Sequence, residues 1–252
     1  MDKNGVKSYK PFNKVSARPC IFEYIYFARP DSIMNGKNVY DCRKNMGKQL
    51  ALELKTNADL IIPVPDSGVP AALGYSEASK IPFNLGIIRN HYVGRTFIEP
   101  TQTIRQLGIK LKHNANRSII KNKKIVLIDD SIVRGTTAIK IVEMIRNAGA
   151  SEVHMRISSP PIKFPDYYGI DTPSKNELIA SKNSSEEIRK ILKLDSLHFL
   201  SLDGLYHSMG HIKRDINNPQ YTDHCFTGDY PTKLVDRDEG ALKNQLSLLN
   251  DK

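Results

Sequence analysis

Hydrophobic and polar residues follow one another in a pattern that predicts strands alternating with helices. Short apolar runs typical of buried strands occupy residues 20–28, 59–65, 83–88, 125–128 and 152–158. Helical spacing appears between them at 42–56 and 68–80. It recurs after Thr137, where the apolar face is Ala138, Ile141, Val142, Ile145 and Ala148. This alternation predicts an α/β fold with a central, mostly parallel sheet flanked by helices.

Local signals indicate where elements and domains end. Asp41 is expected to cap the helix at 42–56, and Gly149 suits the position just after a helix. Ser184 and Glu187 form a capping box, the signature of a helix start. Residues 1–19 are expected to be a tail or linker and residues 233–252 a polar tail or helix, which leaves one domain at 20–232.

Composition adds limits to this picture. The 252 residues are 40% hydrophobic and 25% charged, and no apolar stretch approaches the roughly 18 residues of a membrane helix. The N-terminus lacks the apolar region of a secretory signal. Three cysteines, odd in number and far apart in the chain, argue against a disulfide framework and favour a reducing cytoplasm.

The positive charge is concentrated in one segment. The chain has a net charge of +10, and residues 89–124 contain nine basic side chains and one acid, Glu99. Such a field attracts an anion, which leaves nucleic acid, anionic lipid and a phosphorylated metabolite open at this point; a solvated basic surface is the simpler interpretation.

The stretch "KKIVLIDDSIVRGTT" (123–137) carries the most specific chemistry. Asp129 and Asp130 follow a buried strand, where ionised carboxylates suit sugar hydroxyls or Mg²⁺. The turn after them leads into a helix N-terminus, which favours a phosphate. Its contributing residues are Ser131, Arg134, Gly135, Thr136 and Thr137. Acids beside a phosphate site describe a phosphorylated sugar, and the G-x-x-x-x-G-K-[ST] pattern of a nucleotide P-loop is absent.

This stretch resembles the phosphoribosylpyrophosphate (PRPP) loop of type I phosphoribosyltransferases. Further stretches narrow the resemblance to the amidophosphoribosyltransferase family, over roughly residues 18–232. They are "FEYIYFARPDS" (22–32), "VPDSGVPAALGY" (64–75), "NHYVGRTFIEPTQTIRQLGIKLK" (90–112), "ISSPPI" (157–162), "YYGIDTPSKNELIA" (167–180) and "FTGDYPT" (226–232). The resemblance implies a type I phosphoribosyltransferase fold with a small C-terminal hood at about 159–220.

The resemblance also implies an activity, the first step of purine biosynthesis. Ammonia released from glutamine replaces the pyrophosphate of PRPP and gives 5-phosphoribosylamine. Asp129, Asp130 and Ser67 are expected to handle ribose and Mg²⁺. Asp66, Ser67 and Gly68 match the family's pyrophosphate loop, with a cis peptide bond expected near Asp66–Ser67.

The basic segment matches the family's mobile loop, expected here at about 90–122. The family loop closes over PRPP and shields the reacting carbon from water. Arg89, Tyr92, Arg95 and Arg105 are candidates for contacts with pyrophosphate or for locking the loop.

Two departures from the family pattern change what is expected. The glutaminase half and its N-terminal cysteine are missing from the resemblance, so the truncated chain is expected to use free ammonia or ammonia from a separate glutaminase subunit. Some relatives bind an iron–sulfur cluster through four cysteines. Here Cys20 fits the first position, Asp166 falls on the second, and Pro219 and Thr222 replace the last pair. No cluster is therefore expected.

The main alternative is a PRPP-binding protein without catalysis, either a regulator or a gene remnant. The basic pI of about 9.4 permits nucleic-acid contact, but no DNA-reading motif is evident and the basic excess lies where a substrate lid is expected. Nucleic acid is therefore an unlikely partner, no membrane partner is expected, and the family's tendency to assemble favours a homo-oligomer.

Overall fold

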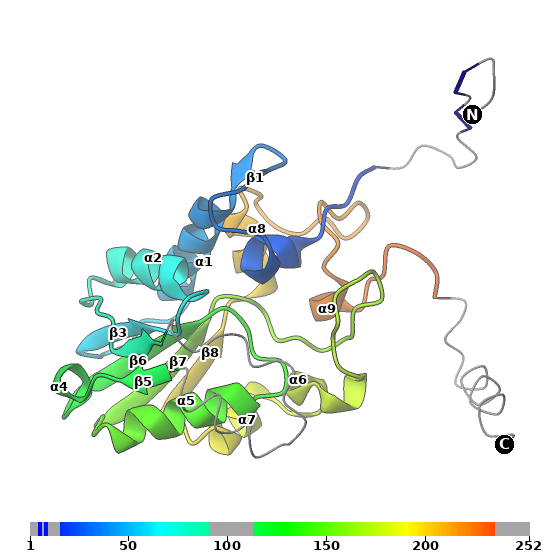
Figure 1. Cartoon of the computed structure of the whole chain (residues 1–252). Coiled ribbons are helices and arrows are strands. Elements are labelled where there is room, and N and C mark those ends of the chain that lie inside the picture. Colours follow the sequence, from blue (N-terminus) through cyan, green and yellow to red (C-terminus); the bar gives the residue numbers. More distant parts are fainter. Residues whose placement is uncertain (1–4, 7, 10–15, 91–112, 235–252) are drawn as a thin grey trace, which may run out of the picture.

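A four-stranded parallel sheet forms the centre of the protein in this computed structural model, which describes residues 5–6, 8–9, 16–90 and 113–234 (Figure 1). In spatial order its strands are β3 (Leu60–Pro63), β6 (Lys124–Asp129), β7 (Glu152–Ile157) and β8 (Ser196–Phe199). β3 and β6 are almost continuously apolar because helices cover both faces of the sheet. Parallel pairing brings the carboxyl ends of all four strands to one edge.

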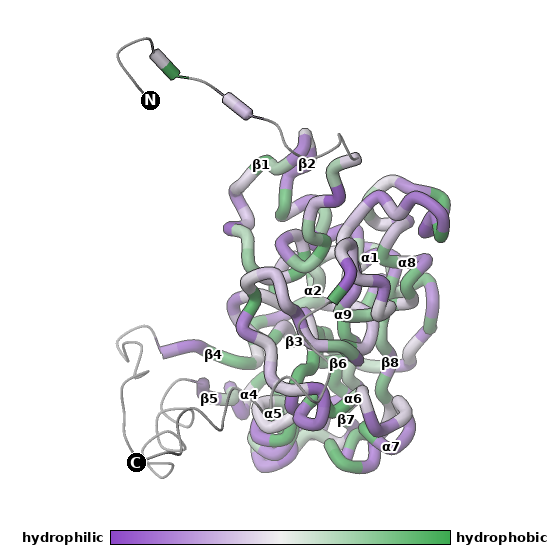
Figure 2. The backbone as a smooth tube through the Cα atoms, turned by 90° about the vertical axis from the view of Figure 1, so that its right-hand side faces the viewer, coloured by the Kyte–Doolittle hydropathy of each residue, from purple (hydrophilic) through white to green (hydrophobic). Residues whose placement is uncertain are grey.

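Two hydrophobic layers lie on the two faces of this sheet. Val126 and Ile128 pack with α1 (Val39–Glu53), α2 (Val69–Ser79) and α8 (Leu202–Ser208). Ile125 and Leu127 point the other way and pack with α5 (Thr136–Asn147) and α7 (Ser185–Ile191). Figure 1 shows α1 and α2 on one side of the strands and α5 on the other, and the hydropathy colouring of Figure 2 follows the apolar run of β6 through the centre.

The remaining elements are short. They are the π-helix η1 (Glu23–Phe27), the strands β1 (Ile33–Met34), β2 (Lys37–Asn38), β4 (Ile87–Arg89) and β5 (His113–Ala115), and the helices α4 (Arg117–Ile120), η2 (Lys175–Glu177), α6 (Ile179–Lys182) and α9 (His224–Thr227). β1 with β2 and β4 with β5 form antiparallel pairs beside the main sheet. Within the described residues, no helix has the length and apolar character needed to cross a membrane.

Most predicted elements are confirmed. The strands expected at 59–65, 125–128 and 152–158 are β3, β6 and β7, and the helices are α1, α2 and α5. Gly149 lies directly after Ala148, the C-cap residue of α5, and has φ +97°. Ser184 and Glu187 form the expected capping box of α7. The strand expected at 83–88 begins later, as β4, although Phe83 makes a single bridge to Ile61.

Two local predictions were wrong. Residues 20–28 do not form a strand: residues 23–27 form the π-helix η1, and the N–H of Ala28, the residue after it, donates to the Glu23 carbonyl at 3.0 Å. The aromatic composition favoured a strand, whereas the Arg43 side chain of α1 binds the carbonyl of Tyr24 within η1 and that of Ala28, the extended residue that ends it. The helix α1 starts three residues earlier than expected, because Asn38 and not Asp41 is its cap.

The predicted segments at the ends and in the loop are described only in part. Residues 235–252 and 91–112 lie outside the described residues, and with them most of the expected C-terminal tail and mobile loop. Residues 113–120, at the end of the expected loop, contain β5 and α4, and β5 pairs with β4.

Close backbone contact between α1 and α2 explains two glycines. A Cβ atom at Gly47 would overlap the carbonyl oxygen of Ala71, and one at Gly74 would overlap that of Lys44. The two helices therefore approach each other at positions where only glycine fits. This packing fixes α2, whose first turn follows the loop at residues 66–68, relative to α1.

Candidate active site

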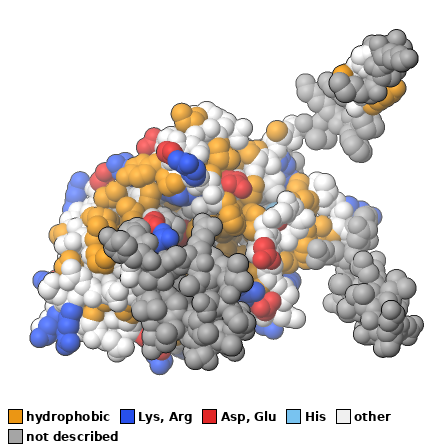
Figure 3. All heavy atoms as spheres, in the orientation of Figure 1, with side chains coloured by type: hydrophobic (Ala, Val, Ile, Leu, Met, Phe, Trp, Pro, Cys, Tyr) orange, Lys and Arg blue, Asp and Glu red, His pale blue; other side chains and the backbone are white. Residues whose placement is uncertain are grey.

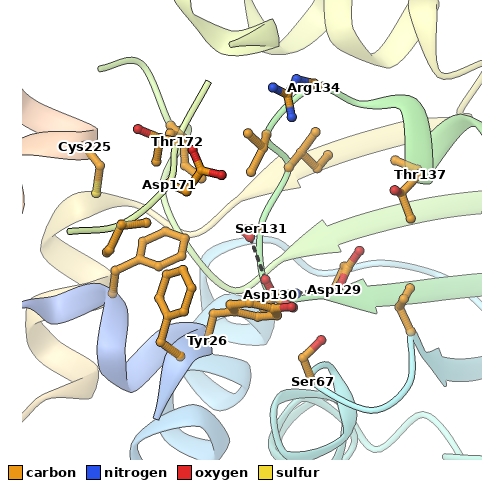
Figure 4. A pocket seen from close by; sticks show the side chains of 18 of the residues that line it. Tyr26, Ser67, Asp129, Asp130, Ser131, Arg134, Thr137, Asp171, Thr172 and Cys225 are labelled. Carbon is orange, nitrogen blue, oxygen red and sulfur yellow. Dashed lines mark hydrogen bonds between the residues drawn. The ribbon is translucent and has the colours of Figure 1, made fainter. Parts of the chain in front are cut away.

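A cavity of about 1100 Å³ opens at the carboxyl edge of the sheet. The loop after β3 and the turn between β6 and α5 line one side, and η1, residues 162–173 and residues 222–225 line the other. Figure 4 shows Ser67, Asp129 and Asp130 together at the base of this pocket, with Asp171 and Thr172 across from them. The position agrees with the rule that parallel sheets bind ligands beyond the carboxyl ends of their strands.

The two predicted acids are buried and joined to each other. Asp129 is 9% exposed and Asp130 is 6% exposed, and the Asp130 N–H donates to Asp129 Oδ1 at 2.9 Å. The Ser131 hydroxyl donates to Asp130 Oδ1 at 2.5 Å (Figure 4). Burial raises the pKa of Asp129 well above its ordinary value, and the neighbouring charge of Asp130 raises it further.

Asp130 is better compensated than Asp129. Burial raises the pKa of Asp130 as well, but hydrogen bonds from Ser131 and Ser67 and the positive charge of Arg43 oppose that rise. Burial thus favours the protonated, neutral forms of Asp129 and Asp130, unless a cation binds and compensates their negative charge.

These carboxylates and the Ser67 hydroxyl have the chemistry of a magnesium site. Mg²⁺ prefers oxygen ligands and is usually held by one or two carboxylates together with phosphate oxygens of a substrate. Among the described residues, no three His, Cys, Asp or Glu side chains gather closely enough to hold a metal ion unaided. The site therefore fits a cation that arrives with oxygen atoms of its ligand.

The turn after β6 forms an anion site beside the acids. Gly135 has φ +80° and precedes α5, whose first N–H groups have no partner within the helix. Thr136 and Thr137 form the first helical positions and line the pocket. The Arg134 side chain is half exposed, and its Nε donates to Glu177 Oε1 at 3.2 Å. This turn can bind a phosphate through backbone N–H groups, hydroxyls and one guanidinium.

The loop after β3 forms the adjacent wall. The peptide bond between Pro65 and Asp66 is cis, one bond before the expected position. A Cβ atom at Gly68 would lie 2.5 Å from the carbonyl oxygen of Ile128, so glycine lets this loop approach β6. Asp66 forms an ion pair with Arg89 at the end of β4, which brings Arg89 into the pocket. The other loop candidates, Tyr92, Arg95 and Arg105, lie outside the described residues.

Arg43 is a pocket residue that the sequence reasoning missed. It is 4% exposed, and its guanidinium donates to the carbonyls of Tyr24 at 2.9 Å and Ala28 at 2.8 Å. Its charge also acts on Asp130. The available signal was its spacing, because Arg43 follows Val39 by four residues and therefore lies on the apolar face of α1.

Asp171 and Thr172 are two further pocket residues that the sequence reasoning missed. They line the pocket from a loop without regular structure, so no periodic pattern marked them. They belong to the stretch at 167–180, whose resemblance to the family was the available signal.

Of the four positions at which some relatives have cluster cysteines, three line the same wall of the pocket. Cys20, Asp166 and Thr222 line the pocket beside Cys225, whereas Pro219 does not. Asp166 Oδ2 lies 2.7 Å from His224 Nε2, so this carboxylate already has a partner. Two thiols, a hydroxyl and a paired carboxylate do not fit a four-cysteine iron–sulfur cluster.

Comparison with known proteins shows which family the chain belongs to. The phosphoribosyl transferase domain model matches residues 31–158, which include residues 66–68 and the whole turn after β6. This chain belongs to the phosphoribosyl transferase domain family. Within this family, it is 58% identical over 246 residues to the amidophosphoribosyltransferase of Rhizobium etli and 50% identical over 234 residues to that of Bacillus subtilis.

The match covers nearly the whole chain but only part of each relative. It includes 97% and 93% of this chain and 50% and 49% of those two proteins, so the chain spans about half the length of the curated relatives it matches. A glutamine PRPP amidotransferase from Bacillus subtilis, solved in complex with ADP and GMP, superposes with a TM-score of 0.82 at 48% identity, over 96% of this chain and 53% of that one. The type I phosphoribosyltransferase fold is thereby confirmed.

Proposed function

We propose that the chain transfers the phosphoribosyl group of PRPP to ammonia, giving 5-phosphoribosylamine and pyrophosphate, the first step of purine biosynthesis. The observation that carries the proposal is the buried pair Asp129 and Asp130 next to the N-terminus of α5. An acid pair for a sugar and its cation, beside an anion site, matches a phosphorylated ribose. The relatives' name, amidophosphoribosyltransferase, supports the same reaction.

Each part of the pocket has a role in this proposal. The turn at 131–137 binds the 5-phosphate through its N–H groups, its hydroxyls and Arg134. Asp129, Asp130 and Ser67 would hold Mg²⁺ and the ribose hydroxyls, and Mg²⁺ bound there would supply positive charge near the departing pyrophosphate. Arg89 and the N–H groups of Asp66 and Ser67 bind that pyrophosphate, whereas the Gly68 N–H donates to the Val64 carbonyl.

The chemistry breaks one bond and forms another at C1 of the ribose. The C1–O bond breaks and its electron pair leaves with pyrophosphate, while the nitrogen lone pair of ammonia forms the new C1–N bond and one proton is released. Positive charge grows on the sugar in this step, and the buried carboxylates lower the free energy of that charged transition state. The aromatic side chains of Phe22 and Tyr26 line the pocket and limit competing attack by water.

The proposal extends to the surroundings of the enzyme. The nitrogen comes from free ammonia or from a separate glutaminase subunit, and the chain assembles as a homo-oligomer. The reaction takes place in the cytoplasm, where the thiols of Cys20, Cys42 and Cys225 stay reduced, as in this structure.

A comparison of nitrogen donors tests the reaction. Pyrophosphate release from PRPP and Mg²⁺ is measured with ammonium chloride, with glutamine and with neither. Release that depends on ammonium and not on glutamine supports the proposal. Binding of PRPP without ammonium-dependent release would contradict it and favour a non-catalytic PRPP-binding protein.

A further inference from the structure

Three distant segments of the chain meet at the wall of the pocket that faces the acids. The Ile21 N–H donates to the Thr222 carbonyl at 3.1 Å, and the Thr222 N–H donates to the Pro19 carbonyl at 2.9 Å. The Lys163 N–H donates to the Cys225 carbonyl at 2.9 Å. The N-terminal segment, the loop after β7 and the residues around α9 are thus held together without a covalent link.

Asp166 organises the loop that forms this wall. Its carboxylate is 3% exposed, and Oδ1 accepts from the N–H groups of Tyr168 at 2.7 Å and Ile170 at 3.0 Å. Its own N–H donates to Thr172 Oγ1 at 2.6 Å. One residue therefore fixes the backbone at two points of the loop and the side chain of a pocket residue at a third.

His224 anchors Asp166 from the opposite segment. Its side chain is 2% exposed, and Nε2 lies 2.7 Å from Asp166 Oδ2. The imidazole stacks on Tyr230 with ring centres 4.8 Å apart and meets the edge of Tyr168 at 5.2 Å. These ring contacts hold the imidazole in its buried position beside the Asp166 carboxylate.

We propose that Asp166 and His224 act as positioning residues that hold residues 166–173 against the pocket. Through this pair, Asp171 and Thr172 keep their places across from Asp130 (Figure 4). Asp166 also stands at a position where the family resemblance expects a cluster cysteine. The effect of the buried pair on catalysis rests on the proposed function, whereas its effect on the loop does not.

Hydrogen exchange of the ligand-free full chain tests the structural part. The variants are Asp166→Asn, His224→Gln and the double variant. The control is His198→Gln, which disrupts another histidine–carboxylate pair. His198 Nε2 lies 3.2 Å from Glu53 Oε2, and neither residue lines the pocket. Loss of the buried pair is expected to speed exchange in residues 163–173 by about tenfold or more, with β6 and β7 unchanged. The control is expected to leave this loop unchanged.

The double variant and the kinetics complete the test. If the two residues act as one unit, the double variant loosens the loop no more than either single variant. The KM for PRPP is expected to rise severalfold in each variant while kcat changes less. Unchanged exchange in the loop, or equal loosening throughout the sheet, would overturn the proposal. An inactive wild-type chain would contradict the proposed reaction but leave the exchange result decisive for the pair.

Discussion

At the scale of single residues, the buried acids Asp129 and Asp130 lower the stability of the ligand-free protein at neutral pH. Both carboxyl groups are buried, and their burial raises the pKa of each. A folded-state pKa above the unfolded value means that stability is full below the unfolded pKa and falls as the pH rises through the folded one. At neutral pH the ligand-free pair is therefore a source of instability, which a bound cation would relieve.

The first prediction concerns Asp129→Asn. The amide oxygen can still accept from the Asp130 N–H but carries no charge. We expect the ligand-free variant to be more stable near neutral pH, by about 1 kcal/mol or roughly 2–4 °C in Tm. The gain should shrink as the pH falls through the raised folded-state pKa of Asp129, and it should vanish below about 4, the pKa of an ordinary aspartate. Thermal unfolding at several pH values measures it.

Asp171→Asn is the matched control for this prediction. Asp171 is an exposed carboxyl that lines the same pocket, so its replacement should change Tm little. A variant at Asp129 that melts below the wild-type protein at neutral pH would show that the ionised carboxylate stabilises the fold, contrary to this account.

Between elements, the most informative contact is that of Arg43 with η1. The guanidinium joins α1 to the carbonyl of Tyr24 in the π-helix and to that of Ala28 directly after it. This contact explains why a strand was wrongly predicted at 20–28. The backbone there is held by the side chain of Arg43, which lies 15 residues after Ala28 in the chain. Strand propensity is local and cannot report such a contact. By contrast, β6 and α5 were predictable since their periodic patterns agree with the faces they bury.

We therefore predict that Arg43→Lys is destabilising. A lysine ammonium cannot reproduce the fork that reaches both carbonyls, and one buried carbonyl loses its partner. The expected loss is about 1–3 kcal/mol in the free energy of unfolding, measured by urea denaturation. Arg29→Lys, at an exposed ion pair with Asp31, is the control and should cost less than about 0.5 kcal/mol. Equal stability of the Arg43 variant and wild type would refute the role given to the guanidinium.

The contact between α1 and α2 gives a second prediction at this scale. Gly47→Ala places a methyl group against the backbone of Ala71, so the helices must separate. We expect a loss of about 3 kcal/mol or more, together with weaker PRPP binding because α2 follows the loop at 66–68. Asn45→Ala, exposed on the same helix, should be neutral or slightly stabilising. Denaturation curves that coincide for both variants would mean that the helices accommodate a larger residue.

For the whole molecule, the sequence pattern was enough to predict a parallel sheet with Asp129, Asp130 and the turn after them at its carboxyl edge. The acids and the turn lie next to each other in the sequence, so one stretch carried most of the site. The far wall was harder to predict, because Asp171, Thr172 and Arg43 come from separate segments that only folding brings together. The prediction drawn from charge stays untested, because most of the basic segment at 89–124 lies outside the described residues. Lys and Arg side chains are scattered over the described part of the face in Figure 3.

Ammonium-dependent pyrophosphate release from PRPP and Mg²⁺ by the wild-type chain and by Asp130→Asn tests the central claim most directly. His198→Gln serves as a control away from the pocket. The account predicts release by the wild-type and control proteins, and a decrease of about 100-fold or more in the Asp130 variant. Release that persists unchanged without the Asp130 carboxylate, or wild-type protein that binds PRPP but releases no pyrophosphate with ammonium, would contradict it.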